Sequence, residues 1–245
     1  MNKLVNICNK INIEISDDQI NCFEKYYELL IEKNKVMNLT AITDKEDVIV
    51  KHFIDSIALI PYLLDKGINT NNELKIIDIG TGAGFPGLPL KIMMPDVKFT
   101  LLDSLNKRVS FLNEVIDELK LKDIEALHGR AEDYASDNKY REKYDICVSR
   151  AVANLSTLSE YCIPFVKEDG YFISYKAGES EEEINNSKNA IKILGGKINK
   201  VEEFVLPGTD ASRVFVFIRK QELTDKKYPR KAGVPAKKPL EWRFI

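Results

Sequence analysis

A glycine-rich segment near the middle of the chain constrains the fold more than any other part of the sequence. Residues 76–87 read Ile-Ile-Asp-Ile-Gly-Thr-Gly-Ala-Gly-Phe-Pro-Gly. The apolar start predicts a buried strand, and the glycines predict a tight turn into a helix. Because glycine has no Cβ, the backbone of such a turn can approach a ligand closely. The segment is typical of folds that bind an adenosine-containing cofactor.

An acidic residue at the end of the next apolar run supports this interpretation. Residues 99–102 (Phe-Thr-Leu-Leu) predict a second strand, and Asp103 follows directly. A carboxylate at this place can accept hydrogen bonds from two ribose hydroxyls. Together, the turn and Asp103 predict a site for a nucleotide-type cofactor.

The chain beyond residue 73 alternates between short apolar runs and amphipathic stretches, and no clear helix is expected within 129–143. This alternation predicts an α/β fold, a mainly parallel sheet with helices on both faces. Strands are expected at 75–79, 98–103, 124–128, 144–149 and 170–175, and helices at 86–94, 105–119, 155–166 and 180–193. Ser104 is the expected N-cap of the second of these helices.

The last part of this region breaks the alternation. Residues 200–206 and 213–219 are apolar and rich in β-branched side chains, and only 207–211 (Pro-Gly-Thr-Asp-Ala) separates them. So short a connection can only join antiparallel strands. A parallel sheet closed by an antiparallel hairpin is the layout of Rossmann-like class I S-adenosylmethionine (SAM) methyltransferases.

The residues before the sheet predict helices. Ser16 to Gln19 form a capping box, and a second helical stretch is expected over 45–64 with a break near Pro61. We therefore predict three parts: an N-terminal helical subdomain (1–72), a SAM-binding core (73–220) and a basic C-terminal tail (221–245).

The cofactor could be SAM or NAD, because Gly82, Gly84 and Gly87 also match the dinucleotide fingerprint. SAM is favoured for three reasons. Asp78 lies where it can organise the glycine turn, the closing hairpin is present, and too little chain follows the sheet to form a second catalytic domain. An NAD-dependent dehydrogenase is the less favoured alternative.

Composition excludes several other classes. The chain has 245 residues, 44% of them hydrophobic and 30% charged, and no apolar run approaches the roughly 20 residues that span a bilayer. The N-terminus lacks the features of a secretion signal, so the three glycosylation sequons are taken as chance matches. The four cysteines have no C-x-x-C spacing. A cytoplasmic protein without structural metal or disulfide is expected.

The net charge of −2 conceals an uneven distribution. Residues 219–245 carry nine basic and three acidic side chains, whereas the rest of the chain is strongly acidic. A basic tail indicates a polyanionic partner. A solvated terminus is the alternative, but the prolines and the apolar end of the tail (Leu240, Trp242, Phe244, Ile245) favour a segment that docks.

The order of these motifs resembles the RsmG family, also called GidB, of bacterial 16S rRNA guanine-N7 methyltransferases. The resemblance covers nearly the whole chain, and its motifs are specific because so many occur in order. They are Asn38-Leu39-Thr40, residues 51–56 (Lys-His-Phe-Ile-Asp-Ser), the glycine turn 78–90, residues 101–108, 128–133 and 149–151, Lys176-Ala177-Gly178, and residues 228–235 with 238–240.

The resemblance implies methylation of N7 of one guanosine in the 530 loop of 16S rRNA, at position 527, with SAM as the methyl donor. The partner would be 16S rRNA or a small-subunit ribosomal particle, and a monomer is expected. N7 of guanine has a lone pair and no proton, so such an enzyme needs to position its substrates but needs no general base. Only two histidines and no evident acid–base pair are present, which fits that mechanism.

The marks of other acceptor chemistries are missing. Exocyclic-amine methyltransferases usually have an Asn/Asp-Pro-Pro-aromatic motif after the fourth strand, where this chain has residues 149–152 (Ser-Arg-Ala-Val). Enzymes that methylate C5 need a nucleophilic cysteine, whereas Cys147 and Cys162 are expected in the core.

Position along the chain assigns the candidate site residues. The cofactor site is expected to comprise Gly80, Gly82, Gly84, Phe85, Asp103, Ser104, Ala131, Glu132 and Arg150. A surface carboxylate is the alternative for Glu132, and packing or capping is expected for His52. Arg150 and Lys176 are the candidates for catalysis, as groups that hold the target nucleotide.

Basic residues near the expected strand ends are candidate RNA contacts, because a guanidinium can grip phosphate bidentately and an ammonium acts as a point charge. They are Lys107, Arg108, Arg130, Lys176, Arg230 and Lys231. For each, solvated surface is the alternative, and Lys107 and Arg108 could simply begin a helix.

Two rival functions remain, one within the class of SAM methyltransferases and one from a different class. A SAM enzyme for a protein or small molecule is disfavoured by the basic tail and by the lack of a substrate domain. A non-catalytic, SAM-sensing RNA-binding module is disfavoured by the intact glycine turn and Asp103.

Overall fold

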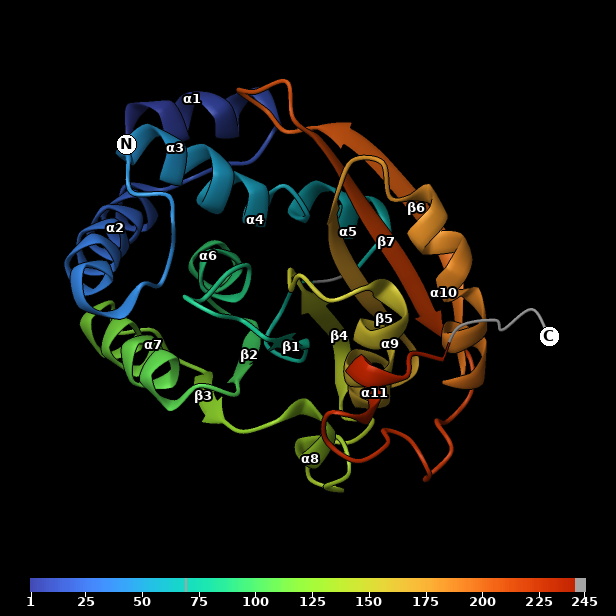
Figure 1. Cartoon of the computed structure of the whole chain (residues 1–245). Coiled ribbons are helices and arrows are strands. Elements are labelled where there is room, and N and C mark those ends of the chain that lie inside the picture. Colours follow the sequence, from blue (N-terminus) through green and yellow to red (C-terminus); the bar gives the residue numbers. More distant parts are fainter. Residues whose placement is uncertain (69, 241–245) are drawn as a thin grey trace.

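A twisted seven-stranded sheet forms the centre of the computed structural model, which describes residues 1–68 and 70–240 (Figure 1). The strand order is β3-β2-β1-β4-β5-β7-β6; β1 to β5 are parallel, and β7 runs antiparallel to both of its neighbours. The expected parallel sheet with an antiparallel closing hairpin is therefore confirmed. The bounds are β1 Lys75–Ile79, β2 Lys98–Asp103, β3 Ile124–His128, β4 Tyr144–Ser149, β5 Val166–Ala177, β6 Gly196–Val205 and β7 Ser212–Lys220.

The central strands are apolar on both faces, because helices cover both sides of the sheet. Ile76 belongs to one core cluster and Ile77, its neighbour, to the other; both are fully buried. Successive side chains of a strand point to opposite faces, so an uninterrupted apolar run is what a doubly covered strand requires.

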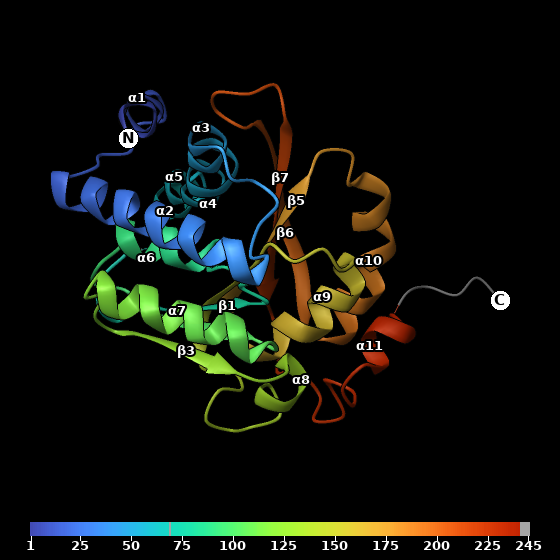
Figure 2. The ribbon, with the colours of Figure 1, turned by 60° about the vertical axis from the view of Figure 1, so that its left-hand side comes forward.

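The two helical layers divide by position in the chain (Figures 1 and 2). The N-terminal helices, α6 and α7 cover one face, and α9 and α10 cover the other. The bounds are α1 Asn2–Lys10, α2 Asp17–Met37, α3 Lys45–Val48, α4 Asp55–Ile57, α5 Ile60–Asp65, α6 Gly87–Met93, α7 Asn106–Glu118, α8 Ala131–Tyr134, α9 Leu155–Cys162, α10 Glu181–Ile193 and α11 Val234–Lys237, with a π-helical segment at Ile49–Ile54 and a 3₁₀ turn at Ile163–Phe165.

The N-terminal helices pack directly on the sheet. Ser16 caps α2 in a capping box with Gln19, as expected. Phe23 and Phe53 lie in the same apolar cluster as Phe215 of β7. The division of the chain at residue 72 stays a prediction about folding units, since the two parts share one core.

Several local expectations need correction. The helix expected over 155–166 ends at Cys162, because Pro164 lacks a backbone N–H and the chain turns into the 3₁₀ segment. The strand expected at 170–175 begins earlier, at Val166. A short helix, α8, lies in the stretch where no clear helix was expected. Ser104 does not cap α7: the N-cap is Leu105, whose N–H donates to Asp103.

The C-terminal segment, residues 221–240, runs back along the body of the molecule. Arg141 anchors its start by donating hydrogen bonds to the carbonyls of Thr224 (2.5 Å) and Tyr228 (2.8 Å). The docking segment inferred from its sequence is therefore present, although residues 241–245, with Trp242, Phe244 and Ile245, lie outside the described residues.

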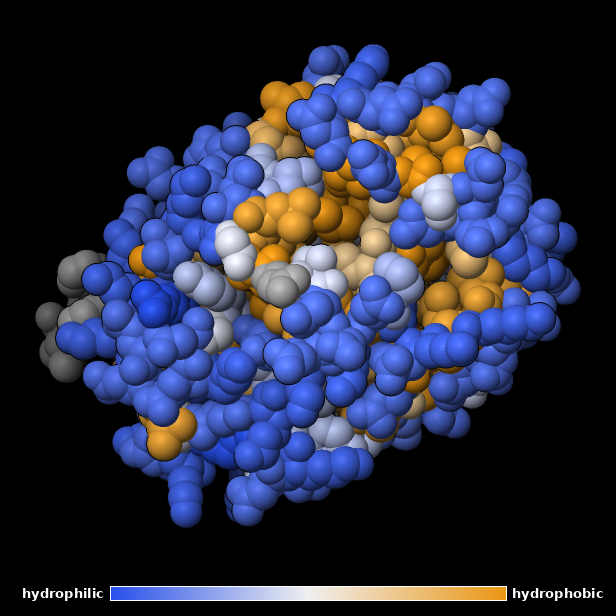
Figure 3. All heavy atoms as spheres, turned by 180° about the vertical axis from the view of Figure 1, so that it is seen from behind, coloured by the Kyte–Doolittle hydropathy of each residue, from blue (hydrophilic) through white to orange (hydrophobic). Residues whose placement is uncertain are grey.

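The side of the molecule opposite the view of Figure 1 shows apolar side chains in hollows between polar rims (Figure 3). Lys75 and Lys98, the first residues of β1 and β2, line one hollow at the amino ends of the strands. Among residues 1–68 and 70–240, no helix is both long and apolar enough to cross a bilayer.

Candidate cofactor cleft and adjoining hollow

The strand order reverses between β1 and β4. From β1 the chain continues to β2 and β3 on one side, whereas β4 leads to β5 on the other. The loops that leave β1 and β4 therefore part from each other, and ligands of open α/β sheets bind at such a point, beyond the carboxyl ends of the strands. Residues 80–86 and 150–154 form these two loops.

Asp78, at the end of β1, organises the glycine turn as expected. Its Oδ2 accepts hydrogen bonds from the Thr81 hydroxyl (2.6 Å) and the Gly87 N–H (2.8 Å). The side chain is fully buried, and burial raises its pKa to about 7 against the lowering effect of these hydrogen bonds. Its Oδ1 has no hydrogen-bond partner among the described residues.

Gly82 and Gly84 of the turn both have positive φ angles, but their surroundings differ. Gly82 (φ 63°) has open space where a Cβ would lie, so its backbone is free to meet a ligand. Gly84 (φ 103°) is packed so closely that a Cβ would lie 2.3 Å from a methyl carbon of Leu88. A side chain at either position would strain the turn.

Asp103, at the end of β2, joins the turns that follow β1 and β2. Its Oδ2 accepts from the Gly82 N–H (2.9 Å) and from Arg108 Nη1 (3.3 Å), and its Oδ1 accepts from the Leu105 N–H (2.9 Å). The carboxylate is 3% exposed. It ties the turn that follows β1 to the turn that follows β2.

A cleft of about 490 Å³, here called the cofactor cleft, lies between these turns. Gly80, Ser104, Ala131 and Glu132 line it, as expected, and its apolar walls include Ile79, Leu102, Ala153 and Leu158. Its volume is in the range of small-molecule sites, and apolar walls suit the faces of an adenine ring. Ser104 and Glu132 supply polar side chains to the lining, so these residues fit SAM.

The C-terminal segment forms one wall of the cofactor cleft. Gly233 and Ala236 line it, and the Gly233 N–H donates to Glu132 Oε1 (2.9 Å). Arg230 binds Glu160, which is 0% exposed, at 2.6 Å, and also donates its backbone N–H to that carboxylate (2.8 Å).

A second hollow of about 500 Å³, here called the adjoining hollow, lies beside the cleft, and Ala151 lines both. Its other lining groups come from the ends of β4 and β5, the starts of β7 and α10, and the N-terminal helices. They include Asp55, Arg150, Val152, Lys176, Glu183 and Arg213. Val152 is fully exposed.

Arg150 stands between the N-terminal helices and the end of β4. Its Nη1 binds Asp55 Oδ2 (2.8 Å), and Arg213 binds the other oxygen of the same carboxylate (2.8 Å). The guanidinium also lies 5.1 Å from the centre of the Phe85 ring, which stacks on His52 at 4.5 Å. Burial and the charge of Arg150 lower the pKa of His52 to about 4, so this histidine is neutral at physiological pH.

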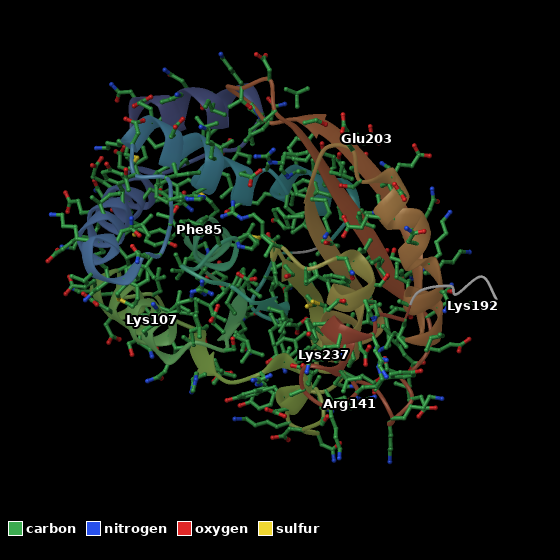
Figure 4. All side chains as sticks on the ribbon, viewed as in Figure 1. Phe85, Lys107, Arg141, Lys192, Glu203 and Lys237 are labelled. Carbon is green, nitrogen blue, oxygen red and sulfur yellow. The ribbon has the colours of Figure 1, made fainter. Side chains whose placement is uncertain are left out.

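Four of the nine predicted cofactor residues line the cofactor cleft: Gly80, Ser104, Ala131 and Glu132. Gly82, Gly84 and Asp103 belong to the turns beside it, whereas Phe85 and Arg150 lie elsewhere. Phe85 is buried among the N-terminal helices, where Figure 4 labels it. Arg150 lines the adjoining hollow with Lys176, whose ammonium donates to Ala153 O (2.9 Å) and Glu183 Oε1 (2.7 Å).

The basic residues predicted to contact RNA fall into two groups. Lys107, Arg130 and Lys231 are exposed. Each of the other three is paired with a carboxylate, so its charge serves the fold as well: Arg108 with Asp103, Lys176 with Glu183, and Arg230 with Glu160. Lys107 on α7 and Lys237 on α11 lie on opposite sides of the central strand ends in Figure 4.

Some residues of the two sites escaped sequence analysis. Tyr161 lines the cofactor cleft, and Asp55, Glu183 and Arg213 line the adjoining hollow. The sequence offered one related signal. Glu160 is a single carboxylate in the apolar stretch 155–166, and a charge in such a place needs a partner, which the structure shows to be Arg230.

The sheet topology, the glycine turn, Asp103 and the cleft at the switch point define a Rossmann-like class I SAM methyltransferase. Solved structures share this fold. M. jannaschii TYW2 in complex with AdoMet matches with a TM-score of 0.50 and 16% identity over 66% of this chain and 75% of that one. A mutant of MtNAS matches with a TM-score of 0.54 and 13% identity over 84% and 75%.

Sequence comparison identifies the family. The model of GidB, "rRNA small subunit methyltransferase G", matches residues 19–211. Proteins named "Ribosomal RNA small subunit methyltransferase G" are 51% identical in Clostridium botulinum, over 98% of both chains, and 53% identical in Acetivibrio thermocellus, over 97% of this chain and 95% of the relative. The chain belongs to the RsmG (GidB) family, as its motifs indicated.

Proposed function

We propose that this chain transfers the methyl group of SAM to N7 of a guanosine in the 530 loop of 16S rRNA, at position 527. Family membership supports the activity. The observation that carries the proposal structurally is the pair of hollows that share Ala151, because methyl transfer needs two ligands side by side.

For this methyl transfer the protein needs mainly to position SAM and the target guanosine. When bound, SAM supplies a sulfonium methyl group, whose bond to sulfur breaks as its bond to guanine N7 forms, with the bonding electrons staying on sulfur. Since N7 has no proton to lose, no general base is required. The residues around the two hollows need to orient both ligands and exclude water.

The residues of the cofactor cleft divide the binding of SAM among them. Gly80, Gly82 and Gly84 shape the turn that faces the methionine part, and Asp103 with Ser104 holds the ribose. Ala131 and Glu132 lie against the adenine. Phe85 acts indirectly, by supporting Arg150 and His52 behind the turn.

The adjoining hollow takes the target nucleotide. Arg150 and Arg213 share the single carboxylate of Asp55, so this cluster carries one net positive charge, within a lining of three basic and three acidic side chains. Such a charge attracts the phosphate of the nucleotide. Lys107, Arg108, Arg130 and Lys231 extend the contact to neighbouring phosphates, and Arg230 holds the segment that carries Lys231.

The acidic body of the chain repels naked RNA, so the substrate is a small-subunit ribosomal particle, in which shape and protein contacts contribute to recognition. One chain supplies both hollows, which supports a monomer. With such a substrate, the protein acts in the cytoplasm.

Mass spectrometry of nucleosides from 16S rRNA, with and without the gene, tests the proposal. Loss of one 7-methylguanosine from the 530 loop, restored by purified protein and SAM, is the expected result. An unchanged rRNA profile from a protein that still binds SAM would direct the search to a protein or small-molecule acceptor.

A further inference from the structure

We propose that Glu183 recognises the target base, by accepting hydrogen bonds from N1–H and the N2 amino group of guanine in the adjoining hollow. This inference rests on the proposed function, because it names the group that selects guanine at the acceptor site. Glu183 lies in the first turn of α10 and is half-buried.

The contacts of Glu183 leave one side of its carboxylate available. Oε1 accepts the Leu155 N–H (2.6 Å) and the Lys176 ammonium (2.7 Å). No hydrogen bond to Oε2 occurs among residues 1–68 and 70–240. An ionised carboxylate has room for about four hydrogen bonds, so the free oxygen can accept two more.

Lys176 fixes the orientation of this carboxylate. Its side chain is only 9% exposed, and its ammonium is held by Ala153 O as well as by Glu183. Both Leu155 and Ala153 belong to the chain that follows β4, next to Ala151. Glu183 is therefore tied to the loop that separates the two hollows.

The donor pattern of guanine matches this oxygen. Guanine presents two adjacent donors, N1–H and the N2 amino group, on the edge opposite N7, whereas adenine presents an acceptor at N1. Glu183 lies beside the loop that follows Ala151, through its contacts with Leu155 and Lys176. Its Oε2, which accepts no hydrogen bond from residues 1–68 and 70–240, favours guanine over any base that lacks these donors.

Val152 offers a contact of a different kind. It is fully exposed at the edge of the same hollow, between Ala151 and Ala153. An apolar side chain there can pack on the flat face of a base taken out of its stack. The hollow then provides both a surface for the ring and an acceptor for its edge.

Inosine tests the inference, because it keeps N7, O6 and N1–H but lacks the N2 amino group. Small-subunit particles are assembled with guanosine or inosine at the target position, and the initial rate of methylation is measured for each. The wild-type protein is expected to prefer guanosine by about 10- to 100-fold, the effect of one hydrogen bond to a charged group.

The variant Glu183→Gln keeps a carbonyl oxygen for Leu155 but places an amide N–H₂ toward the base. Its preference for guanosine over inosine is expected to fall to within about threefold, with SAM affinity unchanged. Glu182→Gln, an exposed neighbour in the same helical turn, is the matched control and should keep the wild-type ratio.

A Glu183→Gln protein that methylates slowly but keeps the wild-type ratio would overturn the inference and reduce Glu183 to a support for the loop. Loss of the ratio in Glu179→Gln instead would assign recognition to Glu179, another carboxylate of the hollow. If Glu183→Gln does not fold, Glu183→Asp is measured in the same way. A wild-type protein that methylates neither particle would instead refute the proposed function itself.

Discussion

At the scale of single residues, two carboxylates determine the shape of the cofactor cleft. Asp78 holds the glycine turn from inside the sheet, and Asp103 ties that turn to the one after β2. Both carboxylates accept hydrogen bonds from backbone N–H groups of the glycine turn. Each therefore stabilises the turn by pairing donors that would otherwise have no partner. Substitution of either residue should therefore affect SAM before it affects RNA.

Asp103→Ala is expected to lower SAM affinity by at least about 10-fold, because it removes charge-assisted hydrogen bonds to the ribose and to the turn. Isothermal titration calorimetry measures the effect. Asp133→Ala, an exposed carboxylate on α8, is the control and should bind SAM normally. Unchanged affinity in Asp103→Ala would remove the ribose role.

The raised pKa of Asp78 makes a prediction about stability and pH. The folded-state pKa, about 7, lies above the unfolded value, so the unfolded chain releases its proton first as the pH rises. The contribution of Asp78 to stability therefore falls between about pH 4 and pH 7. In urea denaturation without SAM, Asp78→Asn should gain stability relative to the wild type across this range. A constant difference would contradict the prediction.

The turns and their acids could be predicted from sequence, because each role depends on residues close by in the chain. Asp78 contacts Thr81 and Gly87, within nine positions. The partner of Arg230 could not be predicted. Glu160 lies 70 positions from Arg230, and only tertiary packing brings them together.

At the scale of elements, the C-terminal segment is the part that sequence analysis interpreted least well. Its charge indicated a polyanionic partner, and its prolines and apolar end indicated docking. The structure shows that Arg230 is used inside the molecule, where it pairs with Glu160. By contrast, the strands and the hairpin were predicted well, since their apolar runs are long and bounded by turn residues.

Arg230→Ala should therefore weaken SAM binding by about 10-fold or more. The substitution leaves the buried carboxylate of Glu160 without its cation, beneath the wall of the cofactor cleft. Breaking such a pair costs about 3–5 kcal/mol locally. Lys231→Ala, its exposed neighbour, is the matched control for SAM affinity measured by calorimetry.

The double variant Arg230→Ala with Glu160→Gln separates charge from packing. Removing the unpaired charge of Glu160 should restore part of the lost SAM affinity, and a double-mutant cycle measures this recovery. No recovery would mean that the contacts of the arginine stem, rather than the ion pair, hold the segment in place.

At the scale of the whole molecule, the distribution of charge determines which surface of an acidic protein can bind RNA. The net charge is −2, but Lys107 and Arg130 lie just after the carboxyl ends of β2 and β3, and Lys231 and Lys237 lie on the C-terminal segment that forms a wall of the cofactor cleft. Binding to the small-subunit particle should consequently weaken steeply with salt.

Lys107→Ala together with Lys231→Ala should make this salt dependence shallower by about 0.7 to 0.9 in logarithmic slope for each lost phosphate contact. Filter binding at several salt concentrations measures the slope. Lys192→Ala, on α10 at the far side of the molecule in Figure 4, should leave it unchanged. A change of the same size in the slope for Lys192→Ala would indicate that the total charge of the protein, and not local phosphate contacts, sets the salt dependence.

The wall that Gly233 and Ala236 give to the cofactor cleft has a consequence for how this protein matures. Synthesis runs from the N-terminus, so all seven strands and the glycine turn are translated before this wall. The nascent chain has an incomplete SAM site until residues 233–236 have been added. Premature termination near residue 225 would therefore yield a chain that has every strand of the sheet but lacks this wall, and such a chain should bind SAM more weakly than the full one.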